Sequence, residues 1–506
     1  MVLKKHLLAL MILLGLGLFA MRTFWGPNYF DGHDAQAHLV RLYQYDLALK
    51  DGQILPQWAG DLLAGRGYPV FIFAYPLPYF IAELFHLTGF SLAVAIKLTF
   101  VLAYLISIVG MYFLSGFVGA ILWGFAPYMF VKIFITGSLG VVVSFAIIPW
   151  FFLSVIKKNY LGVTIFLTLW IMSHPGKLVI FGPLLLLFFL KNWKNYRQLL
   201  LSFLLAFGLS AWYFIPANLE LAFTHFKEFV SNQYVNDFVS FTRLLYSKWG
   251  TNAPGWGDNP LSQQVGIAQW LAICFGFIYW RKLWPYLLSF AISIFLMLSV
   301  SRFVWDLPTL LQSVATPWRF LSLAVFSAAL AGGWAVKLIK AKTWRYLAAG
   351  LLIVLALYGN RNHLRINDVR DYDQNFLENY TGVATGWNEY LPLWIKDTPH
   401  EFPQYKLEVL SGDCQVDYPS VECLKTSTLQ LNTAYFPGWQ VKVDNKITQI
   451  NPGENGMITF SVPAGDHQLT TKFSDTPLRR FSKIISLLSL FSIIIYYFFH
   501  RANHVS

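Results

Sequence analysis

The sequence predicts an all-α polytopic membrane protein that carries one small β-rich domain before its last helix. Of the 506 residues, 56% are hydrophobic and only 13% are charged. The apolar residues gather in blocks that are long enough to cross a bilayer. Residues 361–479 are the exception, because short stretches of alternating polar and apolar residues replace the long blocks there. We therefore expect about twelve transmembrane helices and an extracytoplasmic β domain.

Each long apolar block is predicted to form a membrane-spanning helix. The first block has a basic start but no small-residue cleavage site before Asn28, so we expect an anchor rather than a cleavable signal peptide. The fifth and sixth blocks are shorter than the ~20 residues of an upright span, so they could instead form one re-entrant hairpin. The predicted spans are 6–24, 91–114, 116–134, 139–156, 160–173, 177–190, 198–216, 263–280, 284–300, 318–336, 344–360 and 480–500.

The distribution of charge gives the expected orientation. With the N-terminus in the cytoplasm, the short cytoplasmic loops carry basic residues, and all 26 Asp and Glu residues lie elsewhere. Basic residues in short loops stay on the cytoplasmic side, so we expect both termini there and the protein in the cell membrane. The net charge of +12 then reflects anchors near anionic lipid. We expect no nucleic-acid partner. The basic residues are Lys157, Lys158, Lys191, Lys194, Arg197, Arg281, Lys282, Lys337, Lys340, Lys342, Arg345 and Arg501.

Three regions follow from this pattern of spans. Within the first external loop, residues 77–88 predict a short helix on the outer membrane surface, opened by Pro78 and closed by Gly89. The expected regions are a transmembrane domain at 1–360 with its first external loop at 25–90, an extracytoplasmic domain at 361–479, and a last helix with a cytoplasmic tail at 480–506.

The extracytoplasmic domain is predicted to be a small β-sandwich. Tight hairpin turns are expected at Asp444-Asn445 and at Pro463-Ala464-Gly465. Cys414 and Cys423 lie close enough in sequence to form a disulfide, or they remain two separate thiols. The predicted strands are Lys406–Leu410, Thr428–Ala434, Gln440–Val443, Met457–Val462 and Gln468–Phe473.

The densest group of reactive side chains lies at residues 28–41, directly after the first apolar block. Asp34, His38 and Arg41 are spaced so that one helix would present them on one face. A carboxylate there could deprotonate an acceptor hydroxyl, and Asp31 with Asp34 could hold a divalent cation such as Mg²⁺ or Mn²⁺. The alternative is a solvated loop, because charges near membrane ends are common.

Further candidates lie at the outer ends of predicted spans. Arg302 follows one span, and Arg319 begins another just after Pro317. Each guanidinium could clamp a lipid phosphate, or it could simply extend to the membrane interface. His174, at the outer end of the fifth span, is either part of such a site or an interfacial residue.

The tryptophans and the absence of several catalytic motifs restrict the reactions that the sequence predicts. Trp58, Trp256 and Trp387 could stack on sugar rings or belong to interfacial belts. The sequence contains no His-Glu-x-x-His, no Gly-x-Ser-x-Gly and no cysteine spacing of a zinc site. These absences argue against zinc-dependent proteolysis and serine hydrolysis.

Six short motifs occur in order along most of the chain. They are Asp34-x-x-x-His38-Leu39-x-Arg41, Gly52-x-x-x-Pro56-x-Trp58, Gly65-x-Gly67-Tyr68-Pro69, Ala126-Pro127-Tyr128, Pro317-Trp318-Arg319-Phe320 and Asn388-Glu389-Tyr390-Leu391-Pro392. With them, the chain resembles the GT-C superfamily of polytopic glycosyltransferases. Within that superfamily it is similar to the bacterial and archaeal membrane family called 6-pyruvoyl-tetrahydropterin synthase related. That label indicates no pterin chemistry here, because the chain offers no zinc-binding histidine set.

The resemblance implies an inverting sugar transfer outside the membrane, from a polyprenyl-phosphate-linked donor to a glycan, lipid or protein acceptor. It implies Asp34 as the base or metal ligand, with Asp31 next and His38 beside them. Relatives place an acidic residue just before the interfacial helix, where this chain reads Phe73-Ala74-Tyr75-Pro76 and Asp61 is the nearest substitute. The expected substrate-binding residues are Arg41, Asp61, Arg66, His174, Arg302, Arg319 and Glu389.

A second reading is a non-catalytic membrane protein that binds or transports polyprenyl-linked or cell-envelope glycans. Translocation pathways bury charges near the bilayer midplane. The predicted spans contain almost no ionisable residues, apart from Lys132 near an outer end. Polarity on one face of the membrane therefore favours interfacial chemistry over transport.

Overall fold

A computed structural model describes residues 2–230, 233–254, 257–307, 310–386 and 388–502, so Trp256 and Trp387 lie outside the described residues. The chain divides into two compact units, and each is described by itself. The first unit comprises Met1–Gln36, Leu77–Phe207 and Val230–Asp371, and the second comprises Ala37–Pro76, Gly208–Phe229 and Tyr372–Ser506.

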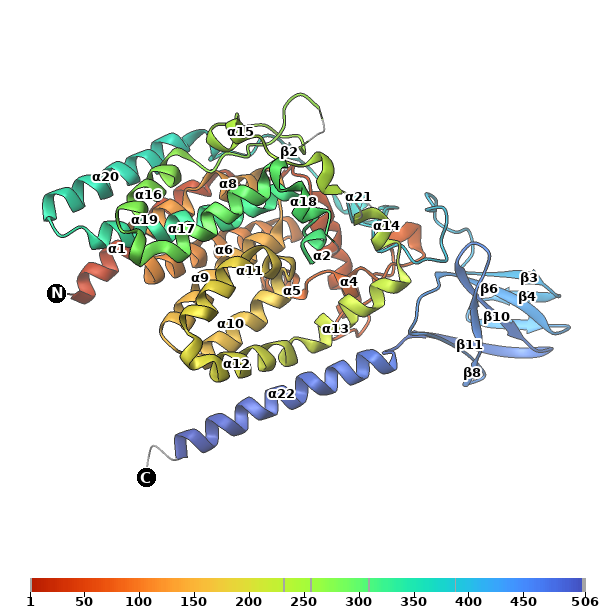
Figure 1. Ribbon diagram of the computed structural model, residues 1–506. Helices are drawn as coiled ribbons and strands as arrows, with labels where there is room; N and C mark the ends of the chain where they lie inside the picture. Colours follow the sequence, from red (N-terminus) through yellow and green to blue (C-terminus); the bar gives the residue numbers. More distant parts are fainter. Residues whose placement is uncertain (1, 231–232, 255–256, 308–309, 387, 503–506) are drawn as a thin grey trace. The chain divides into compact units, whose positions relative to one another are not determined.

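The first unit is helical, and its long helices occur where the apolar blocks predict them (Figure 1). Helix α6 is capped by Ser91, whose hydroxyl accepts a hydrogen bond from the N–H of Val94, and α10 is capped by Asn159 in the same way. The helices are α1 (Val2–Ala20), α5 (Pro76–Leu87), α6 (Leu92–Ser115), α7 (Phe117–Gly124), α9 (Leu139–Ile156), α10 (Tyr160–Ser173), α11 (Gly176–Lys191), α12 (Tyr196–Leu209), α16 (Ile267–Ile278), α17 (Trp280–Met297), α19 (Leu321–Leu338) and α20 (Lys342–Gly359).

Several of these helices are long and apolar enough to identify a multi-pass membrane protein. Among the described residues, three qualify alone, namely Leu92–Ser115, Leu139–Ile156 and Pro317–Leu338. The number rises to six if each of three bent helix pairs forms one span. Twelve complete crossings and their orientation stay predictions.

The predicted span at 116–134 is a broken helix rather than a straight one. Helix α7 and the segment Pro127–Ile135 meet at an angle of 48°. Pro127 disfavours a helical conformation at Ala126, which is extended. The chain then forms α8 (Pro127–Phe130) and a single π-helical turn, η2 (Val131–Ile135). Such turns recur at functional sites, and this one positions Lys132.

Close helix packing places the broken segment in the interior of the unit. Helix α9 packs against α6 and α10, while α19 packs against α7, α16 and α17. A Cβ on Gly333 of α19 would lie 2.8 Å from the carbonyl oxygen of Ser115, so only glycine permits this approach. The rings of Trp123, Phe145 and Phe326 fill the interior beside it.

The remaining elements are the short helices and strands of the first unit and the helices of the second unit. The helix predicted at 77–88 is present as α5, and its position on the membrane surface stays a prediction. The predicted span at 198–216 is interrupted at Ser210, where α12 has ended and α13 begins. The short elements of the first unit are β1 (Tyr29–Phe30), α15 (Phe241–Leu245), α18 (Arg302–Trp305) and β2 (Val369–Arg370). The helices of the second unit are α2 (Ala35–Lys50), α3 (Leu62–Gly65), α4 (Val70–Phe73), α13 (Ala211–Leu219), α14 (Phe226–Val230), α21 (Gln374–Glu378) and α22 (Pro477–Ala502).

The predicted β-rich region is confirmed, and it consists of two sheets before α22 (Figure 1). Between them lies a core of buried side chains that includes Leu429, Val441, Ile458 and Leu469. Every predicted strand is present, and four short strands are additional. One sheet has the order β3 (Leu407–Ser411), β6 (Ser427–Ala434), β10 (Met457–Val462) and β9 (Ile450–Pro452), and the other has the order β4 (Cys414–Asp417), β5 (Ser420–Cys423), β11 (Gly465–Phe473), β7 (Trp439–Val443) and β8 (Lys446–Thr448).

One of the two expected hairpin turns is correct. Asp444 and Asn445 both have positive φ, and they join β7 to the antiparallel β8. The turn at 463–465 does not form a hairpin, because β10 and β11 belong to different sheets. Cys414 and Cys423 face each other in the β4–β5 pair and form a disulfide.

Candidate functional site

The acidic segment after β1 docks onto the π-turn η2. The N–H of His33 donates to the carbonyl oxygen of Ile135 at 3.0 Å, and the N–H of Asp34 donates to that of Thr136 at 2.8 Å. Gly137 permits this contact, since its φ is +59° and a Cβ there would lie 3.2 Å from the nitrogen of Ala35. These contacts hold Asp34 beside the turn that carries Lys132.

Ser138, which lies shortly after η2, orients the carboxylate of Asp34. The hydroxyl of Ser138 donates to Asp34 Oδ2 at 2.9 Å. Asp34 also attracts Lys132 electrostatically. The side chain is half-buried, so Asp34 combines a fixed orientation with access from outside the protein interior.

Lys132, which Asp34 attracts, and Lys177 are both almost completely buried. Lys132 is 5% exposed and Lys177 is 1% exposed. The Nζ atom of Lys132 lies 4.1 Å from the ring centroid of Trp318 and 5.6 Å from that of Tyr128. The Nζ atom of Lys177 lies 5.8 Å from the same Tyr128 ring. The two ammonium groups therefore share one aromatic neighbour, which places them in one site.

Arg319 adds a third cation. It lies in η8 (Pro317–Phe320), directly before α19, and its Nη1 donates to the carbonyl oxygen of Val314 at 2.8 Å. Lys177 reaches the same helix, because its Nζ donates to the hydroxyl of Ser322 at 3.3 Å. The charge of Arg319 acts on Lys132, Lys177 and His174. We call Lys132, Lys177 and Arg319 the cation cluster.

Among the described residues, the cation cluster has no direct carboxylate partner. In the part of the chain that the structure describes, none of the ion pairs involves Lys132, Lys177 or Arg319. Their hydrogen bonds go to a carbonyl and a hydroxyl group. A buried positive charge without a counter-ion is costly, so this arrangement is suited to an anion.

A second carboxylate acts on the cluster from the segment between η5 (Gln233–Asn236) and α15. Burial raises the pKa of Asp237 to about 6, and attraction to Arg319 partly opposes that rise. A carboxyl group with such a pKa exchanges its proton near neutral pH. Asp237 is therefore a second candidate for proton transfer.

Asp31 takes part in contacts that stabilise the fold. Its carboxylate pairs with Arg370 at 3.0 Å, and the neighbouring Tyr29 pairs with Arg370 across the β1–β2 ladder. Among the described residues, no group of three or more His, Cys, Asp or Glu side chains could hold a metal ion. A metal-binding role of Asp31 and Asp34 stays a prediction.

Two further predicted residues of the first unit differ in their surroundings. His174 directly follows α10 as its C-cap and lies within reach of the charges of Lys177 and Arg319. Arg302 is exposed on α18, where its Nε lies 3.9 Å from Asp306. The structure thus brings His174, but not Arg302, to the cation cluster.

The remaining predicted residues belong to the second unit. His38 is buried on α2, and the Nε of Arg41 donates to the carbonyl oxygen of Ala384 at 2.6 Å. Asp61 exchanges hydrogen bonds with Gln44. Arg66 and Glu389 also belong to this unit. The Nη1 of Arg66 donates to the carbonyl oxygens of Ala64 and Glu401, and the charge of Glu389 acts on Tyr68.

Of the residues predicted from the sequence, Asp34, His174 and Arg319 lie in this arrangement, and two other residues of it were missed. Lys177 and Asp237 were not among the predicted site residues, and Lys132 was noted only as an exception within a span. The available signal was an ionisable residue inside an apolar segment, which by default indicates function.

Fold and site together define a multi-pass membrane protein with a buried cationic site beside a carboxylate. Comparison with protein-family models and with curated proteins gives no match. Two cryo-EM structures of arabinofuranosyltransferase AftD from Mycobacteria, one of a mutant, are similar to this chain with TM-scores of 0.46 and 0.44 and identities of 14% and 12%. Each alignment covers 70% of this chain and 27% of the AftD chain. At these TM-scores the likeness does not define the fold, and no function follows from it.

Proposed function

We propose that this protein is a membrane glycosyltransferase that moves a sugar from a polyprenyl-phosphate-linked donor to an extracytoplasmic glycan, lipid or protein. The cation cluster carries the proposal. Lys132 and Lys177 are buried without a carboxylate ion pair in the described residues, and a bound anion would balance their charge. A phosphate on a long apolar chain suits a cationic site inside an apolar helical unit.

In the proposed reaction, the acceptor hydroxyl oxygen bonds to the anomeric carbon while the bond from that carbon to the phosphate oxygen breaks. Polyprenyl phosphate leaves with the electron pair, and attack from the opposite face inverts the anomeric configuration. Asp34 accepts the hydroxyl proton. The cation cluster stabilises the negative charge that grows on the leaving phosphate.

The proposal includes the placement predicted from the sequence. The site faces the extracytoplasmic side of the cell membrane, and both termini are cytoplasmic. The six ordered motifs support membership of the GT-C superfamily and, within it, of the family called 6-pyruvoyl-tetrahydropterin synthase related. Arg319 belongs both to one of these motifs and to the cation cluster.

The test incubates the purified full-length protein with a panel of polyprenyl-phosphate sugars and measures release of the lipid phosphate. Asp34→Asn keeps an oxygen that can accept from Ser138 but cannot take up the acceptor proton. We expect release to fall about 10²- to 10⁴-fold. Asp258→Asn removes an exposed carboxylate of the same unit and should leave release unchanged.

Two outcomes contradict the proposal. If Asp34→Asn releases lipid phosphate as fast as the wild type, the base is another residue. If the wild type retains the donors tightly but releases no lipid phosphate from any of them, the protein is the non-catalytic carrier of the second reading.

A further inference from the structure

A groove of about 960 Å³ lies wholly within the second unit. The loop at 51–60 forms one side of it. Strands β7 and β11 and the first turns of α22 supply the other side. Of the residues that line this groove, Arg66 is the one expected from the sequence to bind substrate, and the proposed transfer step gives it no role.

Positive charge dominates the lining. Arg66, Lys406, Lys472, Arg480 and Lys483 face the groove, against the two carboxylates Asp51 and Asp475. Asp475 is occupied, because its Oδ2 pairs with Lys483 at 2.6 Å. Within the described residues, Lys406, Lys472 and Arg480 form no ion pair with a carboxylate. The groove therefore offers three exposed cations to an anionic ligand.

The rest of the lining suits a polyhydroxylated ligand. Trp439 and Phe473 contribute half-buried aromatic rings, and Thr471 contributes a hydroxyl group that also hydrogen-bonds to Tyr418. The amide of Gln57 is occupied by Asp475 and Arg479, and Thr433 is only 3% exposed. Sugar rings present apolar C–H faces and hydroxyl edges, which match such a mixture.

Trp58 forms part of the base of the groove rather than an open stacking surface. Its side chain is only 4% exposed. The ring packs 5.3 Å from that of Trp439 and 5.0 Å from that of Phe473, measured between centroids. The sequence suggests that Trp58 stacks on sugar rings, but in this groove only Trp439 and Phe473 are exposed enough to do so.

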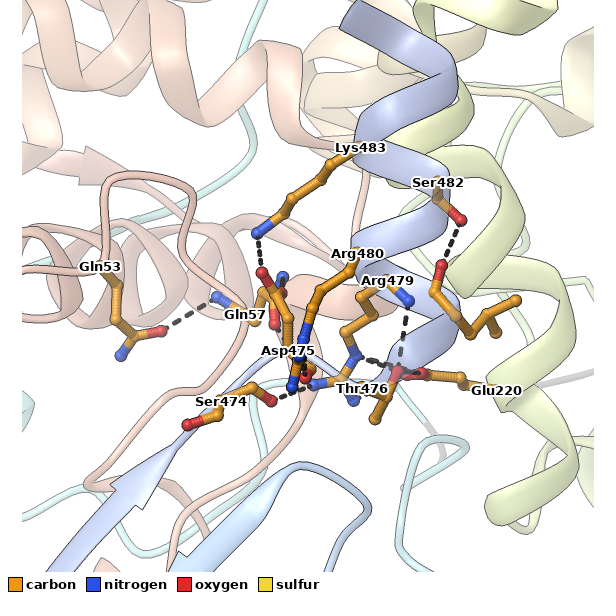
Figure 2. A network of polar contacts seen from close by, with 11 residues as sticks. Gln53, Gln57, Glu220, Ser474, Asp475, Thr476, Arg479, Arg480, Ser482 and Lys483 are labelled. Carbon is orange, nitrogen blue, oxygen red and sulfur yellow. Dashed lines mark hydrogen bonds and ion pairs between the residues drawn. The ribbon is translucent and has the colours of Figure 1, made fainter.

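A polar network holds residues of the groove lining, and Figure 2 shows Gln57 and Asp475 beside Arg479 and Glu220 within it. Arg479 and Glu220 form an ion pair at 2.7 Å, and their side chains are 1% and 2% exposed. Gln57 donates to Asp475 at 3.0 Å, and Gln53 accepts from the N–H groups of Gln57 and Trp58. The groove is therefore shaped before any ligand binds.

We propose that this groove binds an anionic glycan chain. Sugar rings lie against Trp439 and Phe473, and phosphate or carboxylate groups of the chain contact Lys406, Lys472 and Arg480. A lipid headgroup would use the cations alone and leave the two aromatic rings and the hydroxyl of Thr471 without a role. The inference goes beyond the proposed transfer, because binding at the groove requires neither the donor nor the cation cluster.

The test uses the full-length protein in phosphatidylcholine nanodiscs without donor. Fluorescence anisotropy measures binding of labelled hexagalacturonate, of a labelled glycerol-phosphate hexamer and of neutral maltohexaose. We expect at least one anionic chain to bind, and the neutral chain to bind more weakly. In the variant Lys406→Gln/Lys472→Gln/Arg480→Gln, that affinity should fall by about tenfold or more, because three charged contacts are lost.

The matched control is the variant Lys396→Gln/Lys425→Gln/Lys446→Gln. These residues are exposed in the same unit but do not line the groove, and the net charge changes equally. Both variants alter only exposed side chains, and their thermal unfolding midpoints verify folding. We expect less than a twofold change in affinity for the control.

Three results overturn the inference. In the first result, neither anionic chain binds. In the second, both triple variants weaken binding equally. In the third, no glycan binds, and the groove variant instead loses affinity for phosphatidylglycerol vesicles. The last result would assign the groove to a lipid surface. None of these measurements depends on release of lipid phosphate, so the outcome is separate from that of the proposed function.

Discussion

At the scale of single residues, Lys132 and Lys177 bring two ammonium groups into an interior of aromatic rings. The rings of Tyr128, Phe145 and Trp318 surround them. Aromatic faces attract cations, but they recover only part of the hydration that burial removes. Arg319 adds repulsion to both lysines. The charges are therefore arranged for an anion that arrives from outside the protein.

Arg319 tests whether that anion is a phosphate held by a planar guanidinium. Lysine keeps the charge at this position but loses the fork that binds two phosphate oxygens. We expect Arg319→Lys to weaken donor affinity about tenfold, and Arg319→Ala to weaken it further, with normal expression of both. Titration of donor against lipid-phosphate release gives the affinity.

Arg361→Lys is the matched control, because Arg361 also donates to a nearby carbonyl oxygen and lies over an aromatic ring. It should change donor affinity little. An arginine that merely extends to the interface would tolerate lysine. Equal donor affinity in Arg319→Lys and the wild type would therefore show that Arg319 does not hold the phosphate.

Asp237 gives a prediction for the pH dependence of stability. Its pKa in the folded protein is about 6, above the ordinary value of 3.8, so the folded state holds this proton more tightly than the unfolded state. Its contribution to stability is present below pH 3.8 and is lost as pH rises through about 6. Asp237→Asn should therefore raise the thermal unfolding midpoint at pH 7.5, and the gain should shrink toward pH 4.5. A gain that is constant over this range would contradict the assigned pKa.

The residue types, not their surroundings, made the site partly predictable. Asp34 stood out because it lies in the charged stretch 28–41 after an apolar block, at a spacing that would share one helical face with His38 and Arg41. Arg319 stood out because it follows Pro317 at the start of a span. Lys177 lies inside an apolar segment, and only the folded structure shows that it faces Tyr128 beside Lys132.

At the scale of elements, the π-turn η2 links the acidic segment to the cation cluster. It presents Lys132, and the residues that follow it receive the backbone hydrogen bond from Asp34. Gly137 combines a left-handed conformation with a close approach to Ala35. One glycine therefore determines how near Asp34 lies to the lysine.

Replacing that glycine should disturb both stability and the site. Gly137→Ala places a Cβ 3.2 Å from the nitrogen of Ala35 and forces a left-handed conformation on alanine. We expect a loss of about 1–2 kcal/mol, seen as a lower thermal unfolding midpoint. Gly350→Ala, in the open interior of α20, should be neutral or slightly stabilising. An unchanged midpoint in Gly137→Ala would mean that the docking contact is unimportant.

Long elements were predictable, whereas breaks and very short strands were not. Apolar length predicted α6 and α9 almost to the residue, because their composition leaves no other structure. The break before Pro127 was not predicted, because a single proline interrupts a long apolar run there. Strands β8 and β9 have three residues each, too few to show an alternating pattern.

At the scale of the whole molecule, basic residues in short loops predict which side of the membrane each loop occupies. Apolar helices identify a membrane protein, but the orientation rests on the positions of residues such as Lys157 and Lys194. The β-rich region should then lie outside the cell.

Labelling of single cysteines tests this orientation. The background is Cys274→Ser, because Cys274 is free and exposed. In intact cells, a membrane-impermeant thiol reagent should not label Lys157→Cys or Lys194→Cys, and it should label Lys446→Cys. Labelling after permeabilisation shows that the protected sites are reactive. Labelling of Lys157→Cys in intact cells would place the acidic segment and the cation cluster on the cytoplasmic side.

The most direct measurement is binding of undecaprenyl phosphate to the full-length protein by native mass spectrometry. The wild type should bind one lipid phosphate, and both Lys132→Met and Lys177→Met should bind it at least about tenfold more weakly, because each loses a charged contact to the phosphate. Lys337→Met is the matched control: Lys337 lies over the ring of Trp334 near the other end of α19, and its loss should leave binding unchanged. Equal affinity in all four proteins would show that the buried lysines do not hold a lipid phosphate.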